Sequence, residues 1–108
     1  MVPSKPLAIS ETGWVGEDLT IDEFQLSIKS DSAKQAAYMS RLLEESEAMQ
    51  MEFVIWWTVA DFDTLWSETL AEDPTAKIWK DIGLYDGQQA ARTSLNTWSG
   101  WLNRPLDN

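Results

Sequence analysis

The stretch Pro6–Trp14, with the sequence PLAISETGW, decides which fold this chain can adopt. Its first part is mostly apolar and is typical of a short buried strand, and it ends in the carboxylate of Glu11. A glycine and a tryptophan follow, as expected where a strand opens into a binding site. Burying an ionisable group at the end of an apolar strand costs several kcal/mol unless a partner compensates it or a reaction uses it. Glu11 is therefore the first candidate for a catalytic carboxylate, and a plain solvated strand-end carboxylate is the alternative.

The overall charge limits the partners of this chain. Its 108 residues include 18 acidic and 8 basic side chains, which gives a net charge of −10. A field of that sign repels phosphate backbones and anionic lipid, so we expect neither nucleic acid nor a membrane as a partner. The longest apolar run, Phe53–Trp57, is too short to span a bilayer, and the first residues lack the apolar core of a signal peptide. Neutral ligands such as sugars remain compatible with the charge.

The chain contains no cysteine and no histidine. Thiol nucleophiles, serine–histidine triads and Cys/His zinc sites are therefore excluded, and acid–base chemistry must come from carboxylates, lysine or tyrosine. We expect no cofactor and no metal site. Asp61 and Asp63 supply too few oxygens for calcium, so the simpler interpretation is that one of them caps a turn. The absence of cysteine leaves the cellular compartment undetermined.

Seven tryptophans in 108 residues are a marked excess. The indole ring often lies half-exposed at ligand sites, where its flat face can stack on the apolar C–H face of a sugar. We expect Trp56, Trp98 and Trp101 to belong to the core, and Trp14 and Trp57 to be available for binding.

Hydrophobic periodicity predicts two strand–helix pairs. They are a strand at 6–11, a helix at about 32–50, a strand at 52–58 and a helix at about 88–102. The first helix has a capping group at Ser30–Ser32. The second strand is apolar on both faces, which is typical of a parallel strand covered on each side.

The connections that follow the strands are long. We predict a loop over 12–31 with a short helical turn near 21–26, irregular chain over 59–79, and a short extended piece with a turn at 82–87. The order is βαβα, so we expect an α/β fold of two βα units with parallel strands, forming a single domain over 1–108. Long loops after strand ends are typical of an α/β enzyme with its site at that edge. A two-stranded parallel unit is not expected to be stable alone.

Three segments together resemble the end of a known barrel family. The stretch Lys5–Trp14 resembles the seventh strand of retaining glycoside hydrolases with a (βα)8 TIM barrel, Phe53–Trp57 resembles their eighth strand, and Trp79–Gly87 resembles their closing segment. The resemblance covers essentially the whole chain and is closest to galactanase-like and cellulase-like members. It implies that the chain is a partial barrel, the seventh and eighth strand–helix units of eight.

The resemblance also implies roles for single residues. Glu11 would be the nucleophile that forms a glycosyl-enzyme, and Trp57 the platform beneath the reacting sugar. Four further residues would lie in loops around the cleft and contribute to substrate binding: Trp14, Asp61, Asp63 and Trp66. The nucleophile of a retaining enzyme lies about 5–5.5 Å from a second carboxyl group that acts as acid and then as base.

This sequence departs from the family in lacking that second group. The acid/base belongs to the fourth strand of the barrel, usually just after an asparagine, and no such strand is present. We therefore expect a glycosidase fragment that is inactive alone, with carbohydrate as the partner of the complete enzyme. Two alternatives remain: a non-catalytic self-associating (βα)2 module, in which several copies supply the missing strands, and a carbohydrate-binding module that uses the tryptophans without chemistry.

Overall fold

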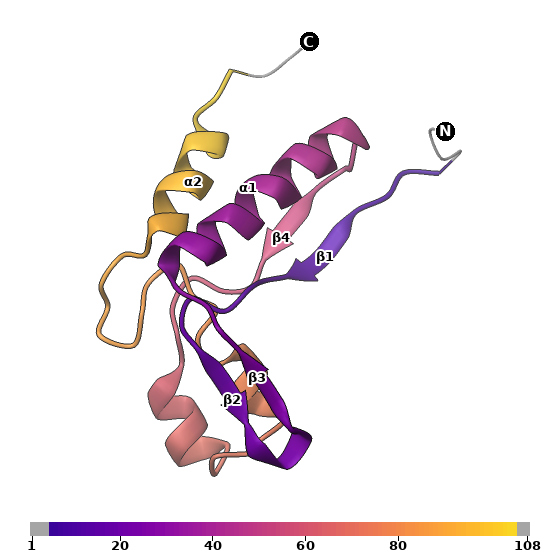
Figure 1. Cartoon of the computed structure of the whole chain (residues 1–108). Helices are drawn as coiled ribbons and strands as arrows, with labels where there is room; N and C mark the ends of the chain where they lie inside the picture. The colour runs from indigo at the N-terminus through magenta and orange to yellow at the C-terminus, as the bar shows by residue number, and fades with distance from the viewer. Residues whose placement is uncertain (1–4, 106–108) are drawn as a thin grey trace.

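The computed structural model describes residues 5–105 of the chain. Its regular elements are β1 (Ile9–Thr12), β2 (Leu19–Ile21), β3 (Leu26–Ile28), α1 (Ser32–Ala48), β4 (Val54–Trp56) and α2 (Thr93–Leu102), as Figure 1 shows. Short 3₁₀ or π-helical turns lie at Asp22–Phe24, Leu65–Thr69 and Ala76–Trp79. No helix among the described residues is long and apolar enough to cross a membrane.

Strands β1 and β4 form a two-stranded parallel sheet. Ile9 lies opposite Val54 and Thr12 opposite Trp56, with an irregularity in register between the two pairs. The ladder continues past β4, because the backbone N–H of Trp57 donates to the carbonyl of Thr12 at 2.8 Å. The predicted α/β class with two parallel strands is therefore confirmed at this level, and each strand is shorter than its predicted span.

The structure contradicts the prediction of a loop over 12–31, whereas the short helical turn predicted near 21–26 is present at Asp22–Phe24. Strands β2 and β3 pair in antiparallel register, with Leu19 opposite Ile28, and a 3₁₀ turn with Gln25 in the left-handed region (φ 52°) joins them. Leu19 and Ile21 are buried whereas Thr20 between them is exposed, so the period-2 alternation of a half-buried strand was present over only three residues. This hairpin encloses the first core cluster, in which Leu19 and Ile21 pack against Val15 and Ile82.

Helix α1 follows the prediction closely. The carboxylate of Asp31 accepts the backbone N–H of Lys34 at 2.8 Å, which confirms the expected N-cap. The helix covers the sheet with Met39, which packs with Trp56 and Leu84 in the second core cluster. Leu95 and Trp98 of α2 pack against this cluster from the side, so the predicted core position of Trp56 is confirmed.

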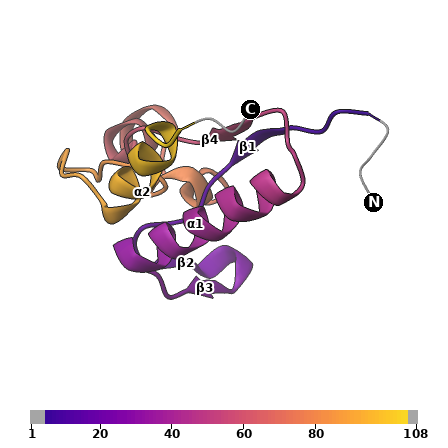
Figure 2. The ribbon, with the colours of Figure 1, turned by 90° about the horizontal axis from the view of Figure 1, so that it is seen from above.

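Among the described residues, helices cover one face of the sheet, and the other face is partly exposed. In Figure 2, α1 lies along one side of β1 and β4. Along β4 the buried Trp56 points to this side, whereas Phe53, Ile55, Trp57 and Val59 are 44–64% exposed. The prediction that this strand is covered on each side is therefore wrong: its residues alternate between the helices and an uncovered apolar face, called here the open face.

Helix α2 begins at Thr93, five residues later than predicted. The carboxylate of Asp86 accepts the backbone N–H groups of Gln88 and Ala90, and Asp86 N donates to the carbonyl of Ala90, which closes a turn. A side chain that bonds the local backbone in this way competes with the helix. The turn predicted for this segment is present, and it takes the residues that the prediction gave to the helix.

The buried side chain of Arg92 links three loops. Its guanidinium pairs with both carboxylate oxygens of Asp61 (2.6 and 2.8 Å), with Glu17 (2.7 Å) and with the carbonyl of Gly83 (2.9 Å). The side chain of Asp61 is fully buried and its Oδ1 also accepts the N–H of Gly83. Gly16 lies so close to the Arg92 side chain that a Cβ there would clash with it. This network determines how the loops after β1 and β4 lie against each other.

Replacing Asp61 by alanine would leave the buried Arg92 with one partly exposed partner carboxylate. Losing one partner of a buried pair costs about 3 kcal/mol or more, so we expect Asp61→Ala to lower the free energy of unfolding by about that amount. Asp63→Ala is the matched control, because that side chain is half-exposed and makes one 3.4 Å contact with Lys80, so it should cost less than about 1 kcal/mol. Urea denaturation measures both, and equal losses would contradict this account of the network.

Candidate functional site

Glu11 and Trp57 lie on the same face of the sheet, at neighbouring strand ends. The hydroxyl groups of Thr12 and Tyr38 of α1 form a 2.7 Å hydrogen bond, so Thr12 faces the helices. Successive side chains of a strand point to opposite faces, and Glu11 therefore faces the open side. Trp57 does the same, because its neighbour Trp56 is buried beneath the helices. Parallel pairing thus brings the predicted nucleophile and the predicted sugar platform together.

Gly13 allows this close approach. A Cβ at Gly13 would lie 2.5 Å from the backbone carbonyl of Trp57 and 3.2 Å from Ile82, so any larger residue would push the two strand ends apart. The peptide bond between Trp57 and Thr58 is cis. The glycine that follows Thr12 in the sequence is therefore required by contact with the neighbouring strand and not by a positive φ.

Two hollows meet at these residues, and together we call them the cleft. The hairpin hollow, of about 320 Å³, extends toward β2 and β3 and is lined by Glu11, Trp57, Trp79, Trp14, Leu19 and Ile82, among others. The loop hollow, of about 370 Å³, extends toward the segment after β4 and is lined by Glu11, Trp57, Trp79, Phe62, Leu65 and Leu70, among others. Three residues border both: Glu11, Trp57 and Trp79.

Trp14 lies at the edge of the hairpin hollow. Its ring stacks on Tyr38 with centroids 5.4 Å apart and an angle of 21° between the planes, so one of its faces is already covered. Its backbone carbonyl accepts the side-chain amide of Gln35 at 3.0 Å. With 37% of its surface exposed, Trp14 is fixed in place and still borders the cleft.

The structure does not bring the other three predicted binding residues into the cleft. Both oxygens of Asp61 are engaged by Arg92, and Asp63 faces Lys80. The indole N–H of Trp66 donates to the carbonyl of Asp73 at 2.9 Å, and its ring lies 5.6 Å from the Lys80 ammonium. In this chain Asp61, Asp63 and Trp66 stabilise the loops after β4. This role supports the cleft, but it does not bring these residues into contact with a ligand.

Trp79 is the cleft residue that sequence reasoning missed. It ends the 3₁₀ turn Ala76–Trp79 and is 39% exposed. No strand or helix periodicity extends through this segment, so nothing in the sequence indicated which way the ring faces. The only signal was its place at the start of the stretch that resembles the closing segment of the barrel family.

Glu11 is the only carboxylate among the described residues that line the two hollows, and neither hollow is lined by lysine, arginine or tyrosine. A general acid must reach the leaving oxygen within hydrogen-bonding distance. The cleft of this chain therefore has a candidate nucleophile and aromatic surfaces, with no proton donor beside them in the part that the structure describes.

Three further carboxylates form a cluster outside the two hollows. Oxygen atoms of Glu17, Asp61 and Asp81 lie within 4.8 Å of one another, a spacing that a metal ion could bridge. Arg92 pairs with the first two and Lys80 with the third at 2.9 Å, so cationic side chains already occupy the cluster. We therefore assign it as an ion-pair cluster.

Burial changes the titration of one member of this cluster. The Asp81 side chain is 7% exposed, and its burial raises its pKa from the ordinary 3.8 to about 6, more than the hydrogen bond from Lys80 lowers it. Between about pH 4 and 6, Asp81 therefore keeps a proton in the folded chain that it has released in the unfolded chain. The contribution of Asp81 to stability is largest below this range and falls as the pH rises through it.

Asp81→Asn removes this titration. Relative to the natural chain, the variant should gain stability as the pH rises from 4 to 7, by about 2–3 kcal/mol in total, since each pKa unit corresponds to about 1.4 kcal/mol. Asp18 and Asp86, whose pKa values are lowered by backbone N–H donors at Ser30 and Ala90, contribute to both variants and cancel. Urea denaturation at each pH measures the difference, and a difference independent of pH would contradict the assignment.

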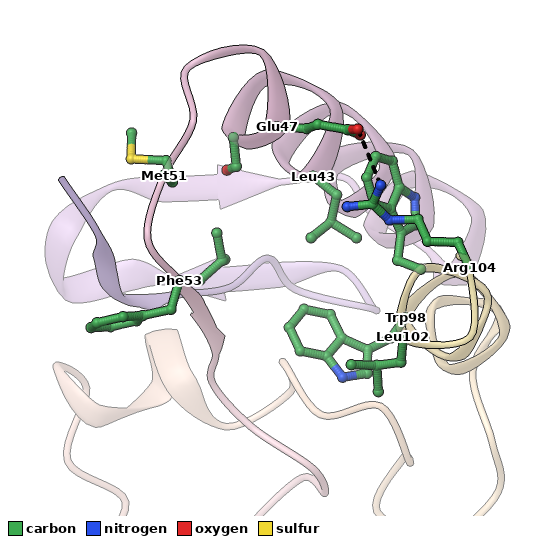
Figure 3. Close-up of a pocket in the computed structure, with 10 residues that line it drawn as sticks. Leu43, Glu47, Met51, Phe53, Trp98, Leu102 and Arg104 are labelled. Atoms are coloured by element: carbon green, nitrogen blue, oxygen red, sulfur yellow. Dashed lines mark hydrogen bonds and ion pairs between the residues drawn. The ribbon is translucent and has the colours of Figure 1, made fainter. Parts of the chain in front are cut away.

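A further apolar hollow, of about 230 Å³, lies at the opposite end of β4 (Figure 3). Phe53, Leu43 and Trp98 line it, and Glu47, its only carboxylate among residues 5–105, is paired with Arg104 at 3.1 Å. The carboxylate of this hollow is therefore already paired with a cation, which distinguishes it from the cleft around Glu11.

Comparison with known proteins identifies no relative: no protein-family model, no curated protein and no solved structure matches this chain. Assignment of a function therefore depends on the residues of the cleft and on the way the fold positions them.

Proposed function

We propose that this chain carries the nucleophile half of a retaining glycosidase site, as the last two strand–helix units of a (βα)8 barrel. One observation carries the proposal: Glu11 and Trp57, at the ends of two adjacent parallel strands, face the same cleft. In such barrels the active site lies at the C-terminal ends of the strands. The remaining strands, and with them the acid/base, would come from outside the residues described here.

The open face supports the proposal that the other strands of the barrel lie outside these residues. In a barrel the helices cover the outside of the sheet and the inner face is filled by side chains of the other strands. Here Phe53, Ile55 and Trp57 lie on a face that no helix of residues 5–105 covers, and each is 44–52% exposed. The Cα radius of gyration is 15.5 Å, whereas a compact domain of this length has about 13 Å. A surface of this kind is expected on an incomplete barrel.

The chemistry assigned to this chain is limited to one step. A carboxylate oxygen of Glu11 attacks the anomeric carbon of a sugar stacked on Trp57, forms an ester bond, and the glycosidic oxygen departs with its bonding electrons. An ordinary sugar alcohol leaves only if an acid protonates it, and residues 5–105 place no such acid in the cleft. A weakly basic leaving group needs no protonation, so a substrate that carries one tests the nucleophile without the missing acid.

The test uses 2,4-dinitrophenyl β-glucoside and β-galactoside with the chain alone. We expect a burst of up to one dinitrophenolate per chain, since Glu11 can displace this leaving group without an acid. Glu11→Gln should reduce the burst rate at least ~100-fold. Glu44→Gln, a change on the solvent-facing side of α1, is the matched control and should leave the burst unchanged. Methyl β-glycosides should not react.

Two results would contradict the proposal. An equal burst from Glu11→Gln would remove Glu11 as nucleophile, and turnover of a methyl glycoside would mean that the chain contains its own acid. Binding of sugars without any burst would instead support a carbohydrate-binding module.

A non-catalytic self-associating module is the second candidate, and the open face favours it. Further copies could cover Phe53, Ile55 and Trp57 and pair with the free edges of β1 and β4. A net charge of −10 on each copy opposes this association, so it should strengthen as salt screens the repulsion. Sedimentation equilibrium at 20 mM and 500 mM NaCl measures this, and a monomer at both concentrations would exclude it.

A further inference from the structure

On the covered side of the sheet, Tyr38 of α1 contacts the end of β1. Its hydroxyl shares a 2.7 Å hydrogen bond with the hydroxyl of Thr12, and its ring stacks on Trp14 with centroids 5.4 Å apart. Thr12 and Trp14 are the first and third residues after Glu11. Tyr38 therefore holds the chain that follows Glu11 at two points, and it does so without lining either hollow of the cleft.

The same side chain also contacts β4. The rings of Tyr38 and Trp56 have centroids 6.0 Å apart and an angle of 59° between their planes, which is within the range of attractive aromatic pairs. The next residue, Trp57, donates its backbone N–H to the carbonyl of Thr12 at 2.8 Å. Because Tyr38 reaches residues of both strands, it fixes the strand end that carries Glu11 against the one that carries Trp57.

Helix α1 holds Tyr38 itself in place. One turn before it, Gln35 is fully buried. The side-chain amide of Gln35 donates to the carbonyls of Trp14 and Gly83, at 3.0 and 3.2 Å. Its amide oxygen accepts the hydroxyl of Ser94 in α2 at 2.6 Å. These bonds attach α1 to the loops after both strands and to α2, so the helix is a rigid support from which a side chain can position its neighbours.

We propose that Tyr38 positions Glu11 for its attack on the sugar, through the hydrogen bond to Thr12. This inference rests on the proposed nucleophilic role of Glu11 and adds a residue outside the cleft that controls the rate of that step. A nucleophile displaced by about 1 Å can react ~100-fold more slowly. A phenylalanine would fill the same space beside Trp14, so the hydroxyl is the part of Tyr38 that this role requires. Tyr38 is a positioning residue, not a catalytic one.

The first test compares the burst of dinitrophenolate from 2,4-dinitrophenyl β-glucoside or β-galactoside in variants that each lack one hydroxyl of the pair. Tyr38→Phe and Thr12→Val should each lower the rate constant of the burst about 5- to 20-fold at saturating glycoside. The amplitude should stay that of the natural chain, because the same number of chains carries Glu11. The double variant should be no slower than the slower single variant, since both changes remove the same bond.

Two further variants separate positioning from a general loss of folding. Thr12→Ser keeps the hydroxyl and should recover most of the burst rate. Tyr85→Phe is the matched control, because Tyr85 packs against the same core cluster as Tyr38 and lies outside both hollows. It should leave the burst unchanged. A variant that only folded less well would lose burst amplitude, whereas displacement of Glu11 lowers the rate constant.

A second measurement does not depend on any reaction. If the Tyr38 hydroxyl holds Thr12, its loss should loosen the bond from the Trp57 N–H to the Thr12 carbonyl. We expect hydrogen exchange of the Trp57 amide, followed by NMR, to be about 3- to 10-fold faster in Tyr38→Phe. The amides in the middle of α1 should exchange at the rates of the natural chain, because this opening is local.

The inference is overturned, and the proposed function stands, if the natural chain gives the burst and Tyr38→Phe matches it in rate. It is also overturned if the Trp57 amide exchanges equally fast in both chains, or if all amides exchange faster by one common factor. If the natural chain itself gives no burst, the proposed function fails, and the exchange rates alone decide whether Tyr38 fixes the two strand ends. The two failures are therefore distinguishable.

Discussion

The parallel pairing of β1 with β4 is the constraint on which the rest of the structure depends. It places Thr12 and Trp56 toward the helices, where the Tyr38 hydroxyl and the second core cluster hold them. The same register turns Glu11 and Trp57 to the opposite face. A shift by one residue would exchange the two faces, bury the carboxylate and expose the core tryptophan, so the burial of Trp56 and the position of Glu11 have one cause.

What covers the open face determines whether the cleft can act. An exposed row of large apolar residues beside free strand edges is unfavourable in water, and a further set of strands would bury both. The Arg92 network shows that the two loops at this edge are already held, because Asp61, Glu17 and Gly83 meet on one guanidinium. The loops on this side of the cleft are thus held in place by the described residues.

Sequence reasoning predicted the parts with strong local signals. The run of apolar residues before Glu11, the Asp31 cap and the apolar segment around Trp56 gave the order of strands and helix. The hairpin β2–β3 was missed because its strands are three residues long, too short for an alternation to stand out. The burial of Asp61 depends on its ion pair with Arg92, and Trp79 borders the cleft beside Glu11 and Trp57. These partners lie more than 20 positions away in the sequence, so no local pattern contains them.

The most direct test of the account is to locate the bond that it assigns to Glu11. The chain would be incubated with 2,4-dinitrophenyl 2-deoxy-2-fluoro-β-glucoside or -galactoside, whose fluorine slows hydrolysis of the glycosyl ester, then digested and analysed by mass spectrometry. The account predicts one fluoroglycosyl group per chain, attached to the peptide that contains Glu11, and none on Glu11→Gln. A label on any other residue, or on the glutamine variant, would contradict it.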